Sequence, residues 1–468
     1  MKFLKYLVLA SLLIPALLIL AFGPRSDAPV PKDRIVVDYW EKWTADEEAA
    51  MKVIVDDFNN SQDRIFVRYV STSNVNQKTL VATAAGVPPD VAGLWDNNLA
   101  QFAEQDALMP LDDLAKEHGI GPSTYMPVFW NACHYKGHLY ALISTPAAVA
   151  LHYNTDEFRA AGLDPDHPPT TLDELDKYAQ LLEKRDAAGH LIQTGFLPTE
   201  PGWFVNFSYL WFGGSIWDEK NHKFTLTDPN VVKAFTWVQS YSKRLGKEAV
   251  NEFRGGVGNF DSPQNPFLAG QMAMTQQGPW MANYIYHLKP SMDGLASGQD
   301  DDLNAPLAER RKRMHWAAAP FPSAVPGLTN ITYCGFDTLV IPRGAAHPKE
   351  AFEFIAYVNR QDVMEKLCMS HSKNSPLANV SDNFLHHHKN PYIDVFEDLS
   401  RSPNAHSIPQ IPIYPEVDAE LTVLVQSLAL MKAEPEPALR DLQVRLQKIY
   451  DAFMEKQQAR EKLGLAGH

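Results

Sequence analysis

The chain has 468 residues, of which 45% are hydrophobic and 21% are charged, and its formal net charge at pH 7 is −14. At roughly 100–200 residues per domain, this length predicts two or three domains rather than one core. An acidic chain repels nucleic acid and anionic lipid, so we expect neither as a partner.

The amino terminus carries an export signal. A short basic start, Met1 to Lys5, precedes an apolar run from Tyr6 to Phe22. This length lies between a signal-peptide core and a minimal spanning helix, and the sequence leaves open whether the segment is cleaved or stays in the membrane. We predict that residues 1–33 are a signal peptide or membrane anchor plus a linker. The protein would be exported, and either periplasmic or anchored at the outer face of the inner membrane.

The cysteines exclude a disulfide scaffold. Cys133, Cys334 and Cys368 are too few for one and lack metal-ligand spacing, so we expect buried thiols that pack as small apolar groups. The sequence also carries no phosphate loop, dinucleotide fingerprint or nucleophile elbow. It therefore predicts no cofactor, no metal site and no enzyme.

The first part of the chain alternates strands and helices. β-branched and aromatic residues predict strands over 34–40, 64–70 and 89–94, and helical spacing predicts helices near 44–58 and 77–85. This order indicates crossover connections and a parallel sheet.

Ligands of parallel α/β sheets bind beyond the carboxyl ends of the strands, which places 40–44 and 95–98 at the expected site. Thr44 begins the first helix, and Glu47, three positions on, predicts a capping box.

A second unit follows near Tyr140. Its predicted elements are a strand over 147–153, a capped helix that starts at 170–175, an aromatic-rich helix over 203–212, and a strand over 224–227 that leads into a helix at Asp228. Two amphipathic helices, 416–431 and 436–455, end the chain.

Two polar stretches fall outside this pattern. The run 293–313 contains three consecutive aspartates and four consecutive basic residues, and 386–388 are three histidines. We expect both to be solvated surface.

Five segments, taken in order, resemble a known family. Tyr39-Trp40-Glu41-Lys42-Trp43 follows the first strand, and the others are 85–91, 140–154, 168–175 and 267–280. The last, which contains Phe-Leu-Ala-Gly-Gln-Met-Ala-Met and ends in Gly278-Pro279-Trp280, is the most specific. Together they are similar to the extracellular solute-binding proteins of ABC sugar transporters, family 1, of the maltose-binding type. In one segment Leu172 replaces the usual tryptophan.

The resemblance implies an α/β fold of the two-lobed periplasmic-binding-protein type. Each lobe would be a sheet flanked by helices, joined by a hinge that the chain crosses near 143–148, 274–278 and 333–337. The implied bounds are 34–144 and 275–333 for lobe 1, 145–274 and 334–400 for lobe 2, and 401–468 for carboxyl-terminal helices that pack across the lobes.

Aromatic and acidic residues suit a sugar ligand. The apolar faces of a sugar stack on flat rings, and its hydroxyls need acceptors, of which carboxylates are the strongest. Carried over from the resemblance and from strand-end positions, the candidate ligand-binding residues are Trp40, Trp43, Asp96, Asn97, Glu200, Trp203, Trp280, Tyr333 and Phe336.

These observations predict a substrate-binding receptor of an ABC importer. It would be a monomer that captures a sugar or oligosaccharide between its lobes and delivers it to the transmembrane permease subunits. The alternatives are a membrane-tethered sugar sensor, a glycan-active hydrolase in which Asp96 and Glu200 meet, and a receptor for a non-sugar ligand such as a polyamine.

Overall fold

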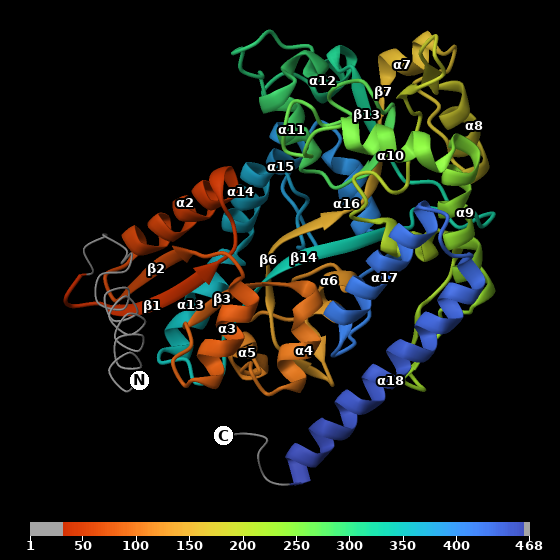
Figure 1. Ribbon diagram of the computed structural model, residues 1–468. Coiled ribbons are helices and arrows are strands. Elements are labelled where there is room, and N and C mark those ends of the chain that lie inside the picture. Colours follow the sequence, from red (N-terminus) through yellow and green to blue (C-terminus); the bar gives the residue numbers. More distant parts are fainter. Residues whose placement is uncertain (1–30, 463–468) are drawn as a thin grey trace, which may run out of the picture.

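The computed structural model describes residues 31–462 and contains one large and one small principal sheet (Figure 1). The large sheet has the order β15-β14-β3-β1-β2, and β6 pairs with β14. Its strands are β1 (Ile35–Glu41), β2 (Ile65–Ser71), β3 (Val91–Trp95), β6 (Leu142–Ala148), β14 (Thr332–Val340) and β15 (Ala405–His406).

The three amino-terminal strands are parallel, as predicted. β1 pairs with β2 on one side and β3 on the other, and the connecting helices are α2 (Ala45–Ser61) and α3 (Val75–Ala84). The predicted capping box at the start of α2 is wrong, because the Thr44 side chain accepts no cap hydrogen bond. Glu47 instead turns to Lys373, whose Nζ lies 3.5 Å from its Oε1.

The small sheet is antiparallel, with the order β12-β7-β13. Its strands are β12 (Met274–Gln277), β7 (Ala150–Asn154) and β13 (Trp316–Ala319). Side chains of β7 alternate between two cores. Ala150 packs in the core of the large sheet, whereas Leu151 and Tyr153 pack in a second core.

Each sheet is covered by helices, so the molecule has two lobes of mixed α/β structure (Figure 1). Around the large sheet lie η1 (Asp96–Asn98), α4 (Leu99–Glu104), α5 (Asp112–Glu117), α6 (Pro127–Ala132), α13 (Pro348–Val358), α14 (Gln361–His371) and α16 (Ile393–Arg401). The remaining helices before residue 400 are α7 (Thr155–Ala160), α8 (Leu172–Leu181), η2 (Val205–Phe212), α9 (Pro229–Leu245), α10 (Lys247–Gly256), α11 (Met281–Leu288), η3 (Pro290–Asp293), α12 (Leu307–Arg313) and α15 (Asp382–His387).

Local signals fix several of these helices. At the start of α8, Thr171 and Glu174 form the predicted capping box, and the Asp228 side chain accepts from the backbone N–H of Asn230 at the start of α9. The aromatic-rich helix predicted over 203–212 is present as the 3₁₀ helix η2.

Short two-stranded ladders and two long helices complete the chain. The ladders are β4 (His134–Tyr135) with β5 (His138–Leu139), β8 (Lys184–Arg185) with β9 (Leu191–Gln193), and β10 (Trp217–Asp218) with β11 (Lys223–Phe224). The helices are α17 (Tyr414–Ala429), which contacts η1 as well as α9 and η2, and α18 (Pro435–Lys462).

Strand pairing bears on where one lobe ends and the other begins. β12 and β13 pair with β7, which lies within predicted lobe 2. The sequence had instead predicted that residues 275–333 belong to lobe 1. The second half of β14 pairs with β3, which places residues after 337 beside the amino-terminal strands. The lobe bounds stay a prediction, and these pairings argue for moving 275–333 to the lobe of β7.

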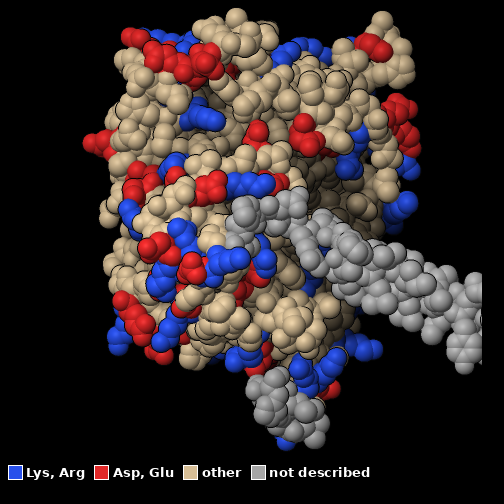
Figure 2. All heavy atoms as spheres, turned by 90° about the vertical axis from the view of Figure 1, so that its left-hand side faces the viewer, with Lys and Arg blue, Asp and Glu red and all other residues tan. Residues whose placement is uncertain are grey.

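Three further expectations concern compartment and surface. Cys133, Cys334 and Cys368 are free, buried thiols, as predicted. No helix within residues 31–462 is both long and apolar enough to cross a bilayer, and residues 1–30, which carry the predicted export signal, lie outside the described part. The face shown in Figure 2 carries acidic and basic side chains interspersed.

Candidate functional site

A cavity of about 430 Å³ lies between the lobes, where the ends of several strands and loops meet. Residues of β3, β6 and β14 line it from the large sheet, and loop and helix residues near Trp203 and Trp280 line it from the other side. The lining residues are Glu47, Trp95, Asp96, Thr145, Pro146, Ala147, Trp203, Phe204, Trp280, Tyr284, Tyr333, Gly335, Phe336, Asp337 and Lys373.

The cavity brings together five of the nine residues proposed from the sequence, which are Asp96, Trp203, Trp280, Tyr333 and Phe336. They come from distant parts of the chain. β3 and β14 are adjacent antiparallel strands, so Asp96 and Tyr333 meet, and the Tyr333 hydroxyl donates to Oδ2 of Asp96 over 3.3 Å.

The other four candidates lie elsewhere. Trp40 is half-buried beside β2, and Trp43 is buried behind the cavity wall, where its ring meets His371 edge-on at 4.8 Å between centroids. Asn97 points its Oδ1 into the interior, and the Glu200 carboxylate pairs with Arg254 over 3.2 Å. Their predicted part in ligand binding stays a prediction.

Aromatic rings form one wall of the cavity. The Trp203 and Trp280 rings lie 6.4 Å apart at 38°, and Phe204 lies 6.2 Å from Trp280. Trp203 is 48% exposed and packs at 4.4 Å on Phe260, so it stands at the mouth of the cavity. Flat, partly exposed rings of this kind can stack on the apolar face of a ligand.

Gly278 makes room for this wall. A Cβ placed on Gly278 would lie 2.0 Å from Cζ3 of Trp280, so only glycine lets the indole lie against the backbone here. A Cβ placed on Gly335 would lie 3.1 Å from the hydroxyl oxygen of Tyr333, which is a tight contact.

Asp96 lines the same cavity as the rings and carries a carboxyl group. Its side chain is buried, and burial together with the negative charge of Asp337 raises its pKa to about 7. Backbone N–H groups of Phe336 and Asn97 and the Tyr333 hydroxyl oppose this rise. Among residues 31–462, no Lys or Arg pairs with this carboxyl, so its strongest further partners would be donors on a ligand.

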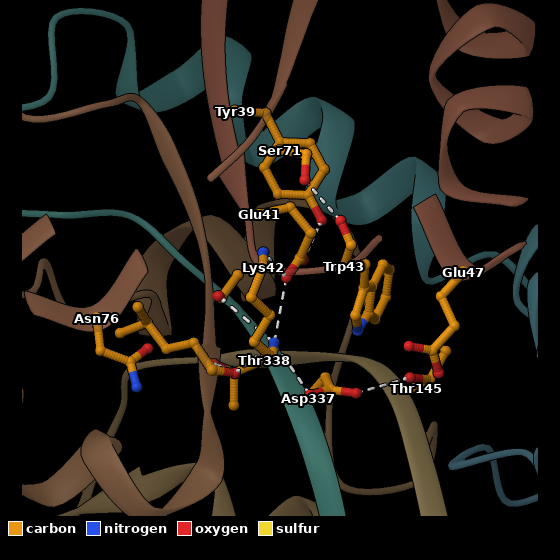
Figure 3. A network of polar contacts seen from close by, with 12 residues as sticks. Tyr39, Glu41, Lys42, Trp43, Glu47, Ser71, Asn76, Thr145, Asp337 and Thr338 are labelled. Carbon is orange, nitrogen blue, oxygen red and sulfur yellow. Dashed lines mark hydrogen bonds and ion pairs between the residues drawn. The ribbon is translucent and has the colours of Figure 1, made fainter. Parts of the chain in front are cut away.

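A buried network of charges supports the floor of the cavity (Figure 3). Lys42 Nζ lies 3.1 Å from Oε1 of Glu41 and 3.0 Å from Oδ1 of Asp337. On the other side of Asp337, Lys373 Nζ lies 3.3 Å from Oδ2, and Thr145 donates to the same oxygen over 3.1 Å.

The two ammonium groups decide the state of Asp337. Burial alone would raise the pKa of this carboxyl, but Lys42 and Lys373 outweigh it and hold the pKa at about 2. Asp337 is therefore ionised at neutral pH, and the Lys373 charge is shared with Asp337 and Glu47. Lys42 Nζ also lies 4.4 Å from the centre of the Trp95 ring, which makes a cation–π contact.

Sequence reasoning missed Lys373, Glu47, Thr145 and Tyr284 as residues of the site. Lys373 lies just past α14, in a segment without strand-end or aromatic signals, and Glu47 had been assigned to helix capping. In the sequence, Asp337 stands out only as the last residue of a predicted hinge crossing. The network could not be seen before β1, β6 and β14 were placed in one sheet, with β3 between β1 and β14.

Two further observations bear on metal and hydrolytic chemistry. Within residues 31–462, no three or more His, Cys, Asp or Glu side chains gather as metal ligands. Of the two carboxyl groups named for a hydrolase, Asp96 lines the cavity, whereas Glu200 is not among the lining residues and pairs with Arg254 over 3.2 Å.

Two lobes with a ring-lined cavity between them define a ligand-binding protein of the two-lobed periplasmic type. A family model described as bacterial extracellular solute-binding protein matches residues 42–365, and the chain belongs to this family.

Two curated relatives match over part of their length. The chain is similar to the sn-glycerol-3-phosphate-binding periplasmic protein UgpB of Pectobacterium atrosepticum, with 25% identity over 268 residues, covering 54% of this chain and 58% of that protein. UgpB of Escherichia coli K12 is 28% identical over 207 residues, covering 42% and 44%. The chain thus spans about half the length of these relatives.

Solved structures match over nearly the whole described chain. CpMnBP1 with mannobiose bound has a TM-score of 0.74 and 26% identity, covering 88% of this chain and 99% of that one. The sugar-binding protein MalE from Xanthomonas citri has a TM-score of 0.72 and 19% identity, covering 90% and 98%, and shows the fold alone.

Proposed function

We propose that this chain is the substrate-binding receptor of an ABC importer, and that it captures an uncharged sugar or short oligosaccharide. The observation that carries the proposal is the cavity that Trp203, Trp280 and Asp96 line together. Stacking rings beside a carboxyl acceptor match the two kinds of surface that a sugar presents. The likeness to CpMnBP1, bound to mannobiose, supports the same reading.

The charges of the cavity argue against an anionic ligand, although the curated relatives are named for sn-glycerol 3-phosphate. Three carboxyl groups line the cavity, on Glu47, Asp96 and Asp337, against the single ammonium of Lys373. That ammonium is already within 3.5 Å of two carboxylates. Among the described lining residues, a phosphate would therefore find no cation that is free of a carboxylate partner.

A binding screen tests the proposal. Isothermal titration calorimetry of the purified chain with mannobiose, maltose and sn-glycerol 3-phosphate should give saturable heat with at least one of the two sugars and none with the phosphate ester. Binding of sn-glycerol 3-phosphate with no response to either sugar would overturn it. Sugar recovered unchanged after prolonged incubation is the result expected of a receptor without catalytic activity.

A polyamine receptor is the second candidate, because the excess of carboxyl groups beside aromatic rings also suits an organic cation. Spermidine distinguishes the two. A polyamine site would bind it with an affinity that falls steeply with salt, whereas a sugar site binds its ligand with little salt dependence.

The receptor would act as an exported monomer. We propose that it docks on the transmembrane subunits of a permease when its lobes close, since contacts from both lobes exist together only in the closed form. The family and the periplasmic relatives support an extracytoplasmic location. Mass analysis of the mature amino terminus distinguishes a cleaved receptor from an anchored one or a tethered sensor, and size-exclusion chromatography tests the monomer.

A further inference from the structure

Two buried side chains come from the polar stretches that had been expected to be solvated surface. Arg310, in α12, and His388, just after α15, are both 0% exposed. Burying a guanidinium is costly unless its donors are satisfied, so the partners of Arg310 show what the burial achieves.

Arg310 holds the backbone of the three-histidine segment. Its Nη2 donates to the carbonyl oxygens of His388 and Lys389 over 3.0 and 3.1 Å, and it pairs with Oδ2 of Asp301 over 3.1 Å. The charged run therefore anchors residues 386–390, which we call the clasp.

His388 connects the clasp to Lys373, a residue that lines the ligand cavity. Its Nδ1 accepts from the backbone N–H of Asn390 over 3.0 Å, so the ring proton resides on Nε2, which lies 3.2 Å from the carbonyl oxygen of Lys373. Burial lowers the pKa of His388 to about 4, which keeps the ring neutral and this donor pattern fixed at neutral pH.

The clasp also holds the opposite wall. Asn390 Nδ2 donates to the carbonyl oxygen of Pro279 over 3.0 Å, immediately before Trp280. Lys373 and Trp280 both line the cavity, and the Lys373 ammonium lies 5.9 Å from the centre of the Trp280 ring. One five-residue segment thus fixes the backbone beside both.

We propose that His388, held by Arg310, is a positioning residue that sets where Lys373 enters the ligand cavity and how far it lies from Trp280. This inference rests on the proposed function. His388 is not among the residues that line the cavity, and it acts through the backbone of Lys373.

The test compares His388→Phe with His388→Gln in the full exported chain, in both wild-type and Lys373→Met backgrounds. The glutamine amide can still donate to the Lys373 carbonyl, whereas phenylalanine fills the space without a donor. His386→Phe, on the exposed neighbour, is the control. Mannobiose affinity is measured by calorimetry, and the Lys373 ammonium is followed without ligand by ¹⁵N-lysine NMR, with Lys373→Met assigning its signal.

We expect His388→Phe to weaken mannobiose binding roughly tenfold in the wild-type background and less than twofold in the Lys373→Met background, because residues that act through one another are non-additive. His388→Gln should recover most of the affinity, and His388→Phe alone should shift or broaden the Lys373 signal. Equal losses in both backgrounds, or an unchanged Lys373 signal in His388→Phe, would overturn the inference. If mannobiose fails to bind the wild type, the choice of sugar is wrong, and the ligand-free NMR comparison decides the positioning role by itself.

Discussion

Gly278 lies directly beneath the indole of Trp280, and a side-chain carbon at this glycine would overlap the ring. We predict that Gly278→Ala forces the indole out of its position and weakens sugar binding at least tenfold, because the main stacking face turns away from the cavity. Calorimetry measures the affinity. Gly255→Ala is the matched control, since a Cβ there meets no atom within 4 Å, and it should bind as the wild type does.

Trp203 and Trp40 were both proposed from the sequence as ligand-binding residues, and their different positions provide a second prediction. Trp203 is half exposed at the cavity mouth, whereas Trp40 lies outside the lining. Trp203→Ala should lower affinity roughly tenfold and should lower the free energy of unfolding by about 2 kcal/mol, because about half of the ring is buried against neighbours such as Phe260. Trp40→Ala should leave affinity within twofold. The reverse ranking would show that the ligand binds on the β1 side instead.

Asp96 should make stability depend on pH. The pKa of its carboxyl is raised from 3.8 to about 7 in the folded chain, so between about pH 4 and 7 the unfolded chain has lost a proton that the folded chain still holds. The unfolded state then binds fewer protons, and stability falls as pH rises through this window and levels off above pH 7.

Asp96→Asn carries no titrating group at this position and removes that contribution. The stability of the wild type minus that of Asp96→Asn should decrease from pH 4 to pH 7 by up to about 4 kcal/mol, at about 1.36 kcal/mol per pKa unit. Urea unfolding at pH 4, 5.5 and 7 measures it. A difference that stays flat over this range would mean that Asp96 is ionised throughout.

Lys42 compensates two buried carboxylates, and its removal should be costly. Lys42→Met leaves Glu41 and Asp337 with less positive charge in the interior, and we expect a loss of about 3–5 kcal/mol in urea unfolding. Arg360→Met breaks an exposed pair with Asp362 of similar length, 2.7 Å, and should cost about 1 kcal/mol or less. Similar losses in the two variants would show that the Lys42 network is solvated.

Much of the fold could be predicted because its signals are local. The alternation of β1, β2 and β3, and the Thr171–Glu174 capping box, depend on residues close in sequence. The strand-end rule then led to Asp96. It could not show that Trp43 is buried beside His371, because nothing near Trp43 in the sequence indicates that contact.

The remaining errors share one physical origin. Glu47, Arg310 and His388 carry residue types that are normally solvated, and each contacts a residue of another segment of the chain. Composition and periodicity describe the average behaviour of a residue type, whereas contacts of this kind exist only once the chain is folded.

Strand β14 carries Tyr333, Phe336 and Asp337 while it is hydrogen-bonded to β6 along its length and to β3 over its second half. Under the proposed function, the residues of this strand that line the cavity would also lie at the hinge predicted near 333–337. Altering them to admit a new sugar would also change the ease with which the molecule flexes. Redesign of selectivity is better directed at Trp203, which can be exchanged while the hinge keeps its stiffness.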